Sequence, residues 1–223
     1  MCGKLECSIM KIMKTIIEKI DKNQKNTDII REAGRILKEG GLVAFPTETV
    51  YGLGADALNE DAAKKIYAAK GRPSDNPLII HITNMKALDK IVSEVPEKAV
   101  KVAEKYWPGP LTMIFNKSDI VPYGTTGGLD TVAVRMPVDE IAREVIDAGG
   151  GYIAAPSANT SGRPSPTTAQ HVAEDLTGRV DMIVDGGAVE IGVESTILDV
   201  TVEPPMILSL IHISEPTRHL RIS

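Results

Sequence analysis

Apolar and polar positions repeat with two periods along the chain, and the longer period predicts helices. In residues 27–37 the apolar side chains recur at helical spacing, Thr27 can cap the first turn, and Gly40 with Gly41 can end the helix. Asn59 can cap a second helix that ends at Lys70. The same spacing predicts further helices at 85–92, 96–107, 141–146 and 172–176.

Short apolar or alternating runs bounded by turn residues predict the strands. These runs are 42–45, 78–82, 111–115, 131–136, 152–155, 180–184 and 196–200, and a Gly/Thr-rich loop at 124–128 separates the third from the fourth. Helices and strands alternate, with no internal repeat and no low-complexity linker. The predicted fold class is therefore α/β, with one domain around a twisted mixed sheet and flanking helices.

The two ends of the chain do not follow this pattern. Residues 1–14 are rich in Met and Lys, and we expect a disordered or non-native start there. Residues 209–223 have neither helical nor strand period and resemble translated sequencing-adapter sequence, so we expect a foreign tail. The expected domain is 15–208.

Composition narrows the class of protein. A net charge of -5 argues against a general nucleic-acid coat, although a local basic pocket stays possible. The two cysteines, Cys2 and Cys7, cannot build a disulfide framework or a four-cysteine zinc site, and we expect no metal site made by the protein alone. No apolar run reaches the ~18 residues that a membrane span needs, so we expect a cytoplasmic protein.

Two polar segments follow or precede strands and are candidates for ligand contacts. The turn at 46–54 carries two threonines, a carboxylate and a tyrosine, and is either internally satisfied or turned toward a small polar ligand. Lys70 and Arg72 flank a glycine, and Pro73 with Pro77 stiffens the segment. These two cations form either an anion site or a solvated basic corner.

Three further places carry polar chemistry. Alternation in 131–136 puts Thr131 and Arg135 on one face, where the arginine needs either a buried carboxylate or a ligand anion. His81 lies in an apolar strand, where a structural role is the commoner one. The loop at 156–167 is dense in hydroxyl and amide groups, which suits nucleotide binding or simple exposure.

Taken together, these segments resemble the YrdC-type threonylcarbamoyl-AMP synthases (L-threonylcarbamoyladenylate synthases) over residues 27–208. The most specific parts are 45–54, 70–82, 156–167 and 194–200. The resemblance implies an open twisted mixed sheet with a large concave cavity. One departure is Ser209, where the family pattern has an arginine after the strand at 206–208; we expect weaker ATP binding from this change.

The resemblance also implies the site residues. Lys70 and Arg72 would be catalytic through charge and positioning. The implied nucleotide-binding residues are Lys70, Arg72, Asn76, Thr131, Ser157, Asn159 and Ser165. The implied L-threonine-binding residues are Thr49, His81, Arg135, Ala155 (through its backbone) and Ser195.

The implied activity is nucleotidyl transfer. L-Threonine, bicarbonate or CO₂, and ATP would give L-threonylcarbamoyl-AMP and pyrophosphate, for threonylcarbamoyl-adenosine modification of tRNA by a downstream transferase complex. Mg²⁺ would be held mainly by the phosphates. Two alternatives stay open: a protein that binds double-stranded RNA or tRNA without turnover, and a relative that adenylates carbamoyl phosphate.

Overall fold

One mixed β-sheet runs the length of the molecule. The computed structural model describes residues 14–21 and 26–208, and within them the sheet has ten strands. These are β1 (Ile16–Lys19), β2 (Val43–Phe45), β3 (Gly52–Asp56), β4 (Ile79–His81), β5 (Leu111–Asn116), β6 (Thr131–Arg135), β7 (Ile153–Ala154), β8 (Met182–Asp185), β9 (Thr196–Asp199) and β10 (Met206–Leu208).

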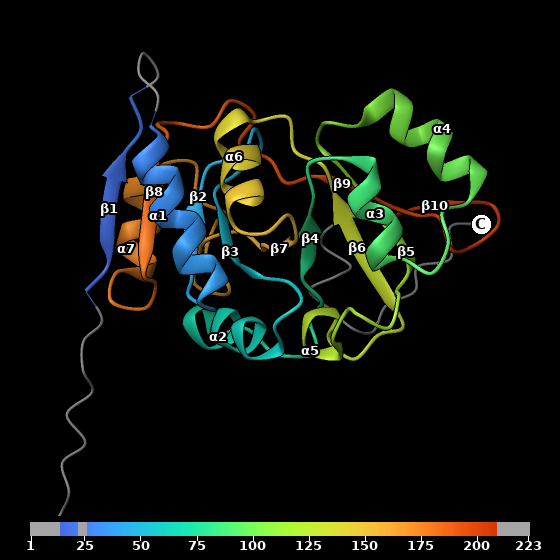
Figure 1. The fold of residues 1–223 in the computed structure, drawn as a ribbon, viewed down its shortest axis with the longest axis horizontal. Coiled ribbons are helices and arrows are strands. Elements are labelled where there is room, and N and C mark those ends of the chain that lie inside the picture. Colours follow the sequence, from blue (N-terminus) through green and yellow to red (C-terminus); the bar gives the residue numbers. More distant parts are fainter. Residues whose placement is uncertain (1–13, 22–25, 209–223) are drawn as a thin grey trace, which may run out of the picture.

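The strand order is β1-β8-β2-β3-β7-β4-β6-β5-β9-β10, so β1 and β10 lie at opposite ends of the sheet (Figure 1). Parallel pairs join β1 to β8, β2 to β8, β4 to β6 and β5 to β9, and the other neighbours are antiparallel. The parallel pairing of β4 with β6 places His81 beside Arg135. This register brings two of the candidate residues to one point of the sheet.

Helices cover the sheet, and their ends follow the capping signals of the sequence. Asn59 accepts hydrogen bonds from the backbone N–H groups of Asp61 and Ala62, and Gly71 ends the helix with a φ of 62°. The described helices are α1 (Thr27–Lys38), α2 (Glu60–Lys70), α3 (Met85–Ile91), α4 (Glu97–Tyr106), α5 (Tyr123–Thr126), α6 (Glu140–Ala148) and α7 (Ala169–Leu176).

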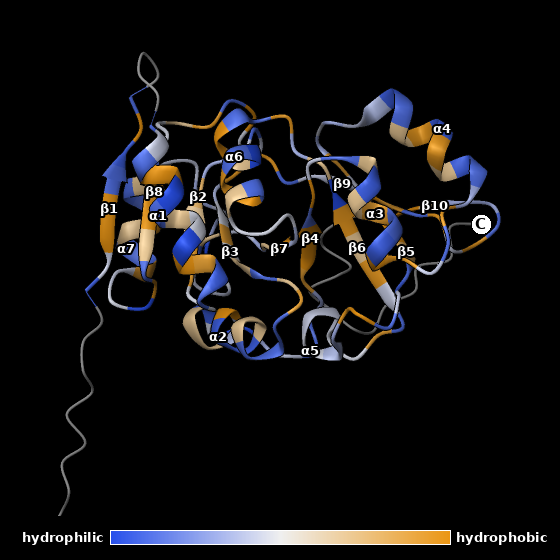
Figure 2. Cartoon of the chain, viewed as in Figure 1, coloured by the Kyte–Doolittle hydropathy of each residue, from blue (hydrophilic) through white to orange (hydrophobic). Residues whose placement is uncertain are grey.

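Two apolar clusters hold these layers together. The larger contains Ile66, Leu78 and Phe115, and the smaller, between α1, α6 and the sheet, contains Leu37 and Val145. Figure 2 shows apolar residues along the central strands and polar ones on the outward parts of α1 and α3. Helices α1 and α6 approach closely at Gly34, where an added Cβ would lie 2.5 Å from the carbonyl oxygen of Ala148.

The fold class predicted from the sequence is confirmed, and each predicted helix and strand has a counterpart. The loop predicted at 124–128 is wrong in part, because residues 123–126 form the short helix α5. Strands β1 and β3 were not predicted. Strand β3 contains Gly52 and Gly54, which weaken the strand signal, and at Gly54 an added Cβ would lie 2.6 Å from the Phe45 ring.

The predictions for both chain ends fall mostly outside the described residues. They concern Cys2, Cys7, the start of the chain up to residue 13, Ser209 and the tail beyond it. The boundaries 15–208 for one domain stay a prediction. Of the helices in the described ranges, none is long and apolar enough to cross a membrane.

Candidate functional site

A cavity of about 420 Å³ opens above β4 and β6, a volume in the usual range for small-ligand sites. Its floor is formed by the same face of the two strands, including His81, Thr131 and Arg135. Around it lie the turn at 47–52, the segment at 72–77, the loop at 155–157 and residues 194–195. Segments far apart in the sequence therefore meet at one hollow.

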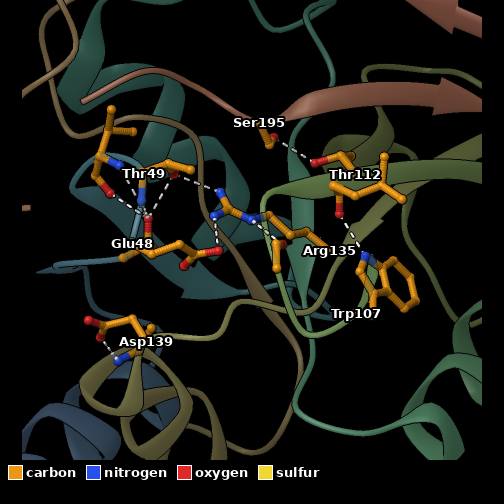
Figure 3. Close-up of polar contacts among 12 residues, drawn as sticks. Glu48, Thr49, Trp107, Thr112, Arg135, Asp139 and Ser195 are labelled. Atoms are coloured by element: carbon orange, nitrogen blue, oxygen red, sulfur yellow. Dashed lines mark hydrogen bonds and ion pairs between the residues drawn. The ribbon is translucent and has the colours of Figure 1, made fainter. Parts of the chain in front are cut away.

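Arg135 lies at the centre of a buried polar network (Figure 3). Its Nη2 lies 2.7 Å from the Glu48 Oε1, and the two side chains are 5% and 6% exposed. Its Nη1 donates to the Thr49 Oγ1 at 2.9 Å, and its Nε to the carbonyl oxygen of Gly109 at 3.4 Å. Of the two partners that the sequence left open for this arginine, the buried carboxylate is present.

The turn at 47–50 is satisfied internally and also faces the cavity. Thr47 Oγ1 donates to the carbonyl oxygen of Val50 at 2.7 Å and lies 2.9 Å from the Thr49 Oγ1. Thr47 and Thr49 both line the cavity. Because Thr49 receives an Arg135 N–H, its hydroxyl position is fixed from two sides.

Ser195 is held by a residue that sequence reasoning missed. The Oγ atoms of Ser195 and Thr112 lie 2.8 Å apart, and both side chains are buried (Figure 3). Thr112 lies opposite Arg135 in the pairing of β5 with β6. The hydrogen bond with Thr112 therefore fixes the position of the Ser195 hydroxyl, and Ser195 lines the cavity.

His81 is a buried, neutral side chain. Its Nδ1 lies 3.2 Å from the carbonyl oxygen of Ile79. Burial, followed by the nearby Arg135 guanidinium, lowers the pKa of His81 to about 3. At neutral pH the uncharged ring can donate or accept a hydrogen bond from a ligand, but it adds no positive charge to the cavity.

Lys70 lies behind the loop that starts at Ser157, and it does not line the cavity. Its ammonium donates to the carbonyl oxygen of Ser157, and at 2.6 Å to that of Asn159. The side chain is almost fully buried, and this burial, followed by the charge of Arg72, lowers the pKa of Lys70 to about 7. The ammonium thus fixes the backbone that presents Ser157.

Arg72 does line the cavity, and Asn76 orients it. The Arg72 Nη2 donates to the Asn76 Oδ1 at 2.5 Å and to the carbonyl oxygen of Pro77 at 3.2 Å. Ser165 similarly donates to the Oε1 of Glu194 at 2.5 Å, and Glu194 faces the cavity. Asn76 and Ser165 therefore affect the cavity indirectly, by holding the side chains of Arg72 and Glu194.

The structure brings most of the predicted residues to this one cavity. Its lining includes Arg72, Thr131, Ser157 and all five predicted threonine-binding residues, whereas Lys70, Asn76, Asn159 and Ser165 lie behind it. Sequence reasoning gave no role to four residues that line or support it: Glu48, Asp75, Thr112 and Glu194. Among the described residues no group of three or more His, Cys, Asp or Glu side chains could hold a metal ion.

Relatives of this chain are found by sequence. The Sua5/YciO/YrdC family model, described as "Telomere recombination", matches residues 35–209. The threonylcarbamoyl-AMP synthase of Pyrococcus abyssi is 59% identical over 179 residues, covering 80% of this chain and 53% of the relative. That of Bacillus subtilis is 51% identical over 200 residues, covering 89% and 58%. The chain thus spans little more than half the length of these curated relatives.

Solved structures of the same family resemble this chain in fold. The crystal structure of P. abyssi Sua5 complexed with L-threonine superposes with a TM-score of 0.81 at 55% identity, covering 88% of this chain and 56% of that one. Escherichia coli YciO superposes with a TM-score of 0.77 at 22% identity, covering 88% and 94%, which speaks for the fold alone. On the family match and the identities together, the chain belongs to the Sua5/YciO/YrdC family.

Proposed function

We propose that this cavity joins L-threonine, bicarbonate or CO₂, and ATP into L-threonylcarbamoyl-AMP, with release of pyrophosphate. One observation carries the proposal. The residues expected to bind threonine and three of those expected to bind the nucleotide line the same hollow. The names of the relatives and the threonine complex of P. abyssi Sua5 support the same reaction.

The Arg135 end of the cavity suits the amino acid. A guanidinium has five N–H donors, and three of its nitrogens already contact Glu48, Thr49 and Gly109. Its remaining N–H groups have no partner among the described residues and are free to meet a carboxylate. Because Glu48 and Thr49 fix the guanidinium plane, the carboxylate would be held in one orientation.

The Arg72 end suits the nucleotide. Arg72 is partly buried, and Asn76 with the Pro77 carbonyl holds its guanidinium in place. Ser157 and Thr131 add hydroxyl groups to the lining of the same cavity. Neutralisation of phosphate charge by a pre-positioned cation is the contribution we assign to Arg72, and Lys70 contributes by fixing the Ser157 loop.

In the proposed reaction the uncharged threonine amine adds to CO₂, loses a proton to solvent and forms a carbamate. A carbamate oxygen then attacks the α-phosphorus of ATP, and the bond from that phosphorus to the bridging oxygen of the β-phosphate breaks. Pyrophosphate leaves with the bonding electron pair. Holding both anions side by side, with the Arg135 and Arg72 ends fixed, supplies proximity that free reactants lack.

Mg²⁺ remains part of the proposal, as a companion of the nucleotide. Asp75 and Glu194 are the carboxylates that line this cavity, and two carboxylates plus phosphate oxygens form a donor set that suits magnesium. When bound, the ion would neutralise phosphate charge. These residues would hold it only together with the nucleotide, since no cluster of three ligands exists among the described residues.

The product is an activated carbamate, so the reaction that consumes it must transfer the threonylcarbamoyl group to a nucleophile. We keep tRNA adenosine as that acceptor, a downstream transferase complex as the partner, and the cytoplasm as the location. These three assignments rest on the family resemblance.

The test measures pyrophosphate released from ATP, with threonine and bicarbonate omitted in turn. Release that requires both supports the proposal, and Arg72→Met should lower it far more than Lys105→Met, which removes an exposed cation over the Tyr106 ring on α4. Release that requires carbamoyl phosphate instead would favour the carbamoyl-adenylate alternative. RNA binding without pyrophosphate release would favour the RNA-binding alternative.

A further inference from the structure

The loop that presents Ser157 to the cavity is also held from outside the cavity, by a carboxylate on α7. Asp175 lies in the last turn of this helix, and its side chain is 8% exposed. Its Oδ2 accepts the N–H of Thr160 at 2.9 Å, and its backbone carbonyl oxygen accepts the Thr160 hydroxyl at 3.4 Å. Asp175 does not line the cavity, and the proposed reaction as described so far gives it no part.

The stability of α7 does not explain this carboxylate. The C-terminal end of a helix carries partial negative charge, so an acidic side chain in the last turn is disfavoured there. Burial also disfavours the charge and acts to raise the pKa of Asp175. Three groups outweigh burial and lower that pKa: the Thr160 N–H, the Arg163 guanidinium and then the charge of Lys70. The carboxylate is therefore ionised at neutral pH, and the loop with Lys70 supplies the partners that stabilise it.

Lys70 holds the same loop through its ammonium group. The ammonium donates to the carbonyl oxygens of Ser157 and Asn159, and to the Asn159 Oδ1 at 3.3 Å. The side-chain nitrogen of Asn159 in turn donates to the carbonyl oxygens of Thr160 and Arg163, at 2.9 Å and 2.7 Å. One chain of hydrogen bonds therefore runs from the ammonium to the two residues that the α7 carboxylate contacts.

The charge of Lys70 depends on its surroundings. None of the ion pairs between described residues includes Lys70. The charged groups that act on it are Arg72, Glu194 and Asp175. Burial, followed by Arg72, lowers the pKa of Lys70 to about 7, whereas Glu194 and Asp175 act to raise it. A change in one neighbouring charge therefore decides how much of Lys70 is protonated at neutral pH, and the neutral amine has fewer N–H donors for the loop.

We propose that Asp175 is a positioning residue for the nucleotide, which keeps Lys70 charged and together with it fixes the loop that presents Ser157. This inference rests on the proposed function, because the position of Ser157 matters to the reaction only where the cavity binds ATP. Arg163, whose side chain is 62% exposed, pairs with the same carboxylate. Its positive charge opposes the effect of Asp175 on Lys70.

The test is ATP binding to the full chain, measured by calorimetry at pH 6 and pH 8 without L-threonine. In Asp175→Asn the amide oxygen still accepts the Thr160 N–H, but the negative charge is gone, so Lys70 should lose its proton at a lower pH than in the wild type. We expect ATP to bind about two-fold more weakly at pH 6 and about ten-fold more weakly at pH 8. The affinity for L-threonine, measured separately, should stay within about two-fold of the wild type at both pH values.

Two further variants separate charge from structure. Asp181→Asn is the matched control, because it makes the same change in a carboxylate that accepts the Leu42 N–H at 2.7 Å and does not line the cavity. Its ATP affinity should stay within about two-fold of the wild type at both pH values. Arg163→Gln removes the opposing positive charge but leaves Asp175 in place, so at pH 8 it should bind ATP at least as tightly as the wild type. Because Arg163 is exposed, this variant tests the inference even where Asp175→Asn is unstable.

Three results would overturn the inference. ATP affinity that falls by the same factor at pH 6 and pH 8 in Asp175→Asn would show a purely structural role. An equal loss in Arg163→Gln would show that the exposed ion pair itself holds the loop. Unchanged ATP affinity in Asp175→Asn would show that the carboxylate has no part in binding. A wild-type chain that binds no ATP would instead overturn the proposed function, and the role of Asp175 with it.

Discussion

The buried pair of Arg135 and Glu48 gives the sharpest stability prediction. Glu48→Gln keeps the size of the side chain and an acceptor oxygen for Arg135, but it leaves the guanidinium charge without its carboxylate. The charged nitrogen and oxygen lie 2.7 Å apart, and both side chains are about 95% buried. Removing one member of such a pair costs about 3 to 5 kcal/mol.

Because the amide oxygen still accepts one hydrogen bond, we expect the lower end, about 3 kcal/mol in the free energy of unfolding. For a chain of this size that loss lowers Tm by roughly 6 to 12 °C. Urea denaturation followed by circular dichroism measures it. Glu144→Gln, an exposed residue without an ion pair among the described residues, is the control and should change stability by less than about 0.5 kcal/mol.

The double variant E48L/R135M distinguishes lost charge pairing from lost packing. Replacing both members of a buried pair by apolar residues of similar size is often neutral, so its stability should return to within about 1 kcal/mol of the wild type. A Glu48→Gln protein as stable as the wild type would refute the reasoning. A double variant less stable than Glu48→Gln would refute it as well.

Three further predictions concern other parts of the site. Because the pKa of His81 in the folded chain is about 3, below its ordinary value of 6.5, the unfolded chain takes up the proton first as the pH falls. The contribution of neutral His81 to the free energy of unfolding is thus fully present above pH 6.5 and is lost as the pH falls toward 3. Between pH 7 and pH 5 the free energy of unfolding of the wild type should fall by about 2 kcal/mol more than that of His81→Asn, as measured by urea titration. Equal losses would contradict this. Thr112→Val should cost about 1 kcal/mol and raise the KM for threonine several-fold by freeing Ser195, whereas an unchanged KM would show that Thr112 only packs. Lys70→Met should lower unfolding free energy by about 2 kcal/mol or more, because it leaves two buried carbonyl groups without a donor, and should weaken ATP binding by calorimetry; ATP affinity equal to the wild type would remove the positioning role of Lys70.

The local sequence pattern was enough to predict features that depend only on the geometry of one strand or one helix. The period of two in 131–136 correctly placed Thr131 and Arg135 on one face, and both line the cavity. Capping residues likewise predicted the start and end of α2. Such features depend on neighbours in the sequence.

The contacts that define the site depend on distant residues, and the pattern could not supply them. Glu48 lies 87 residues from Arg135, Thr112 lies 83 from Ser195, and Lys70 lies 89 from Asn159. Only the sheet order brings these pairs together. The resemblance to a known family predicted Arg135 and Ser195 as threonine-binding residues, but it gave no sign of the residues that support them.

Strand β3 shows a different limit. Its glycines look like turn residues in a sequence, yet Gly54 is required because the Phe45 ring occupies the space of a side chain. A strand selected for close packing therefore lacks the branched and aromatic residues that usually reveal one.

The central claim is that one cavity holds the amino acid and the nucleotide side by side. Nuclear Overhauser effects between bound ligands measure this directly, with L-threonine and a non-hydrolysable ATP analogue added together. We expect a transferred effect between the threonine methyl group and the ribose protons, and its loss in Ala133→Leu, which fills the cavity floor. Binding of both ligands without any effect between them, or an effect that persists in Ala133→Leu, would contradict the account.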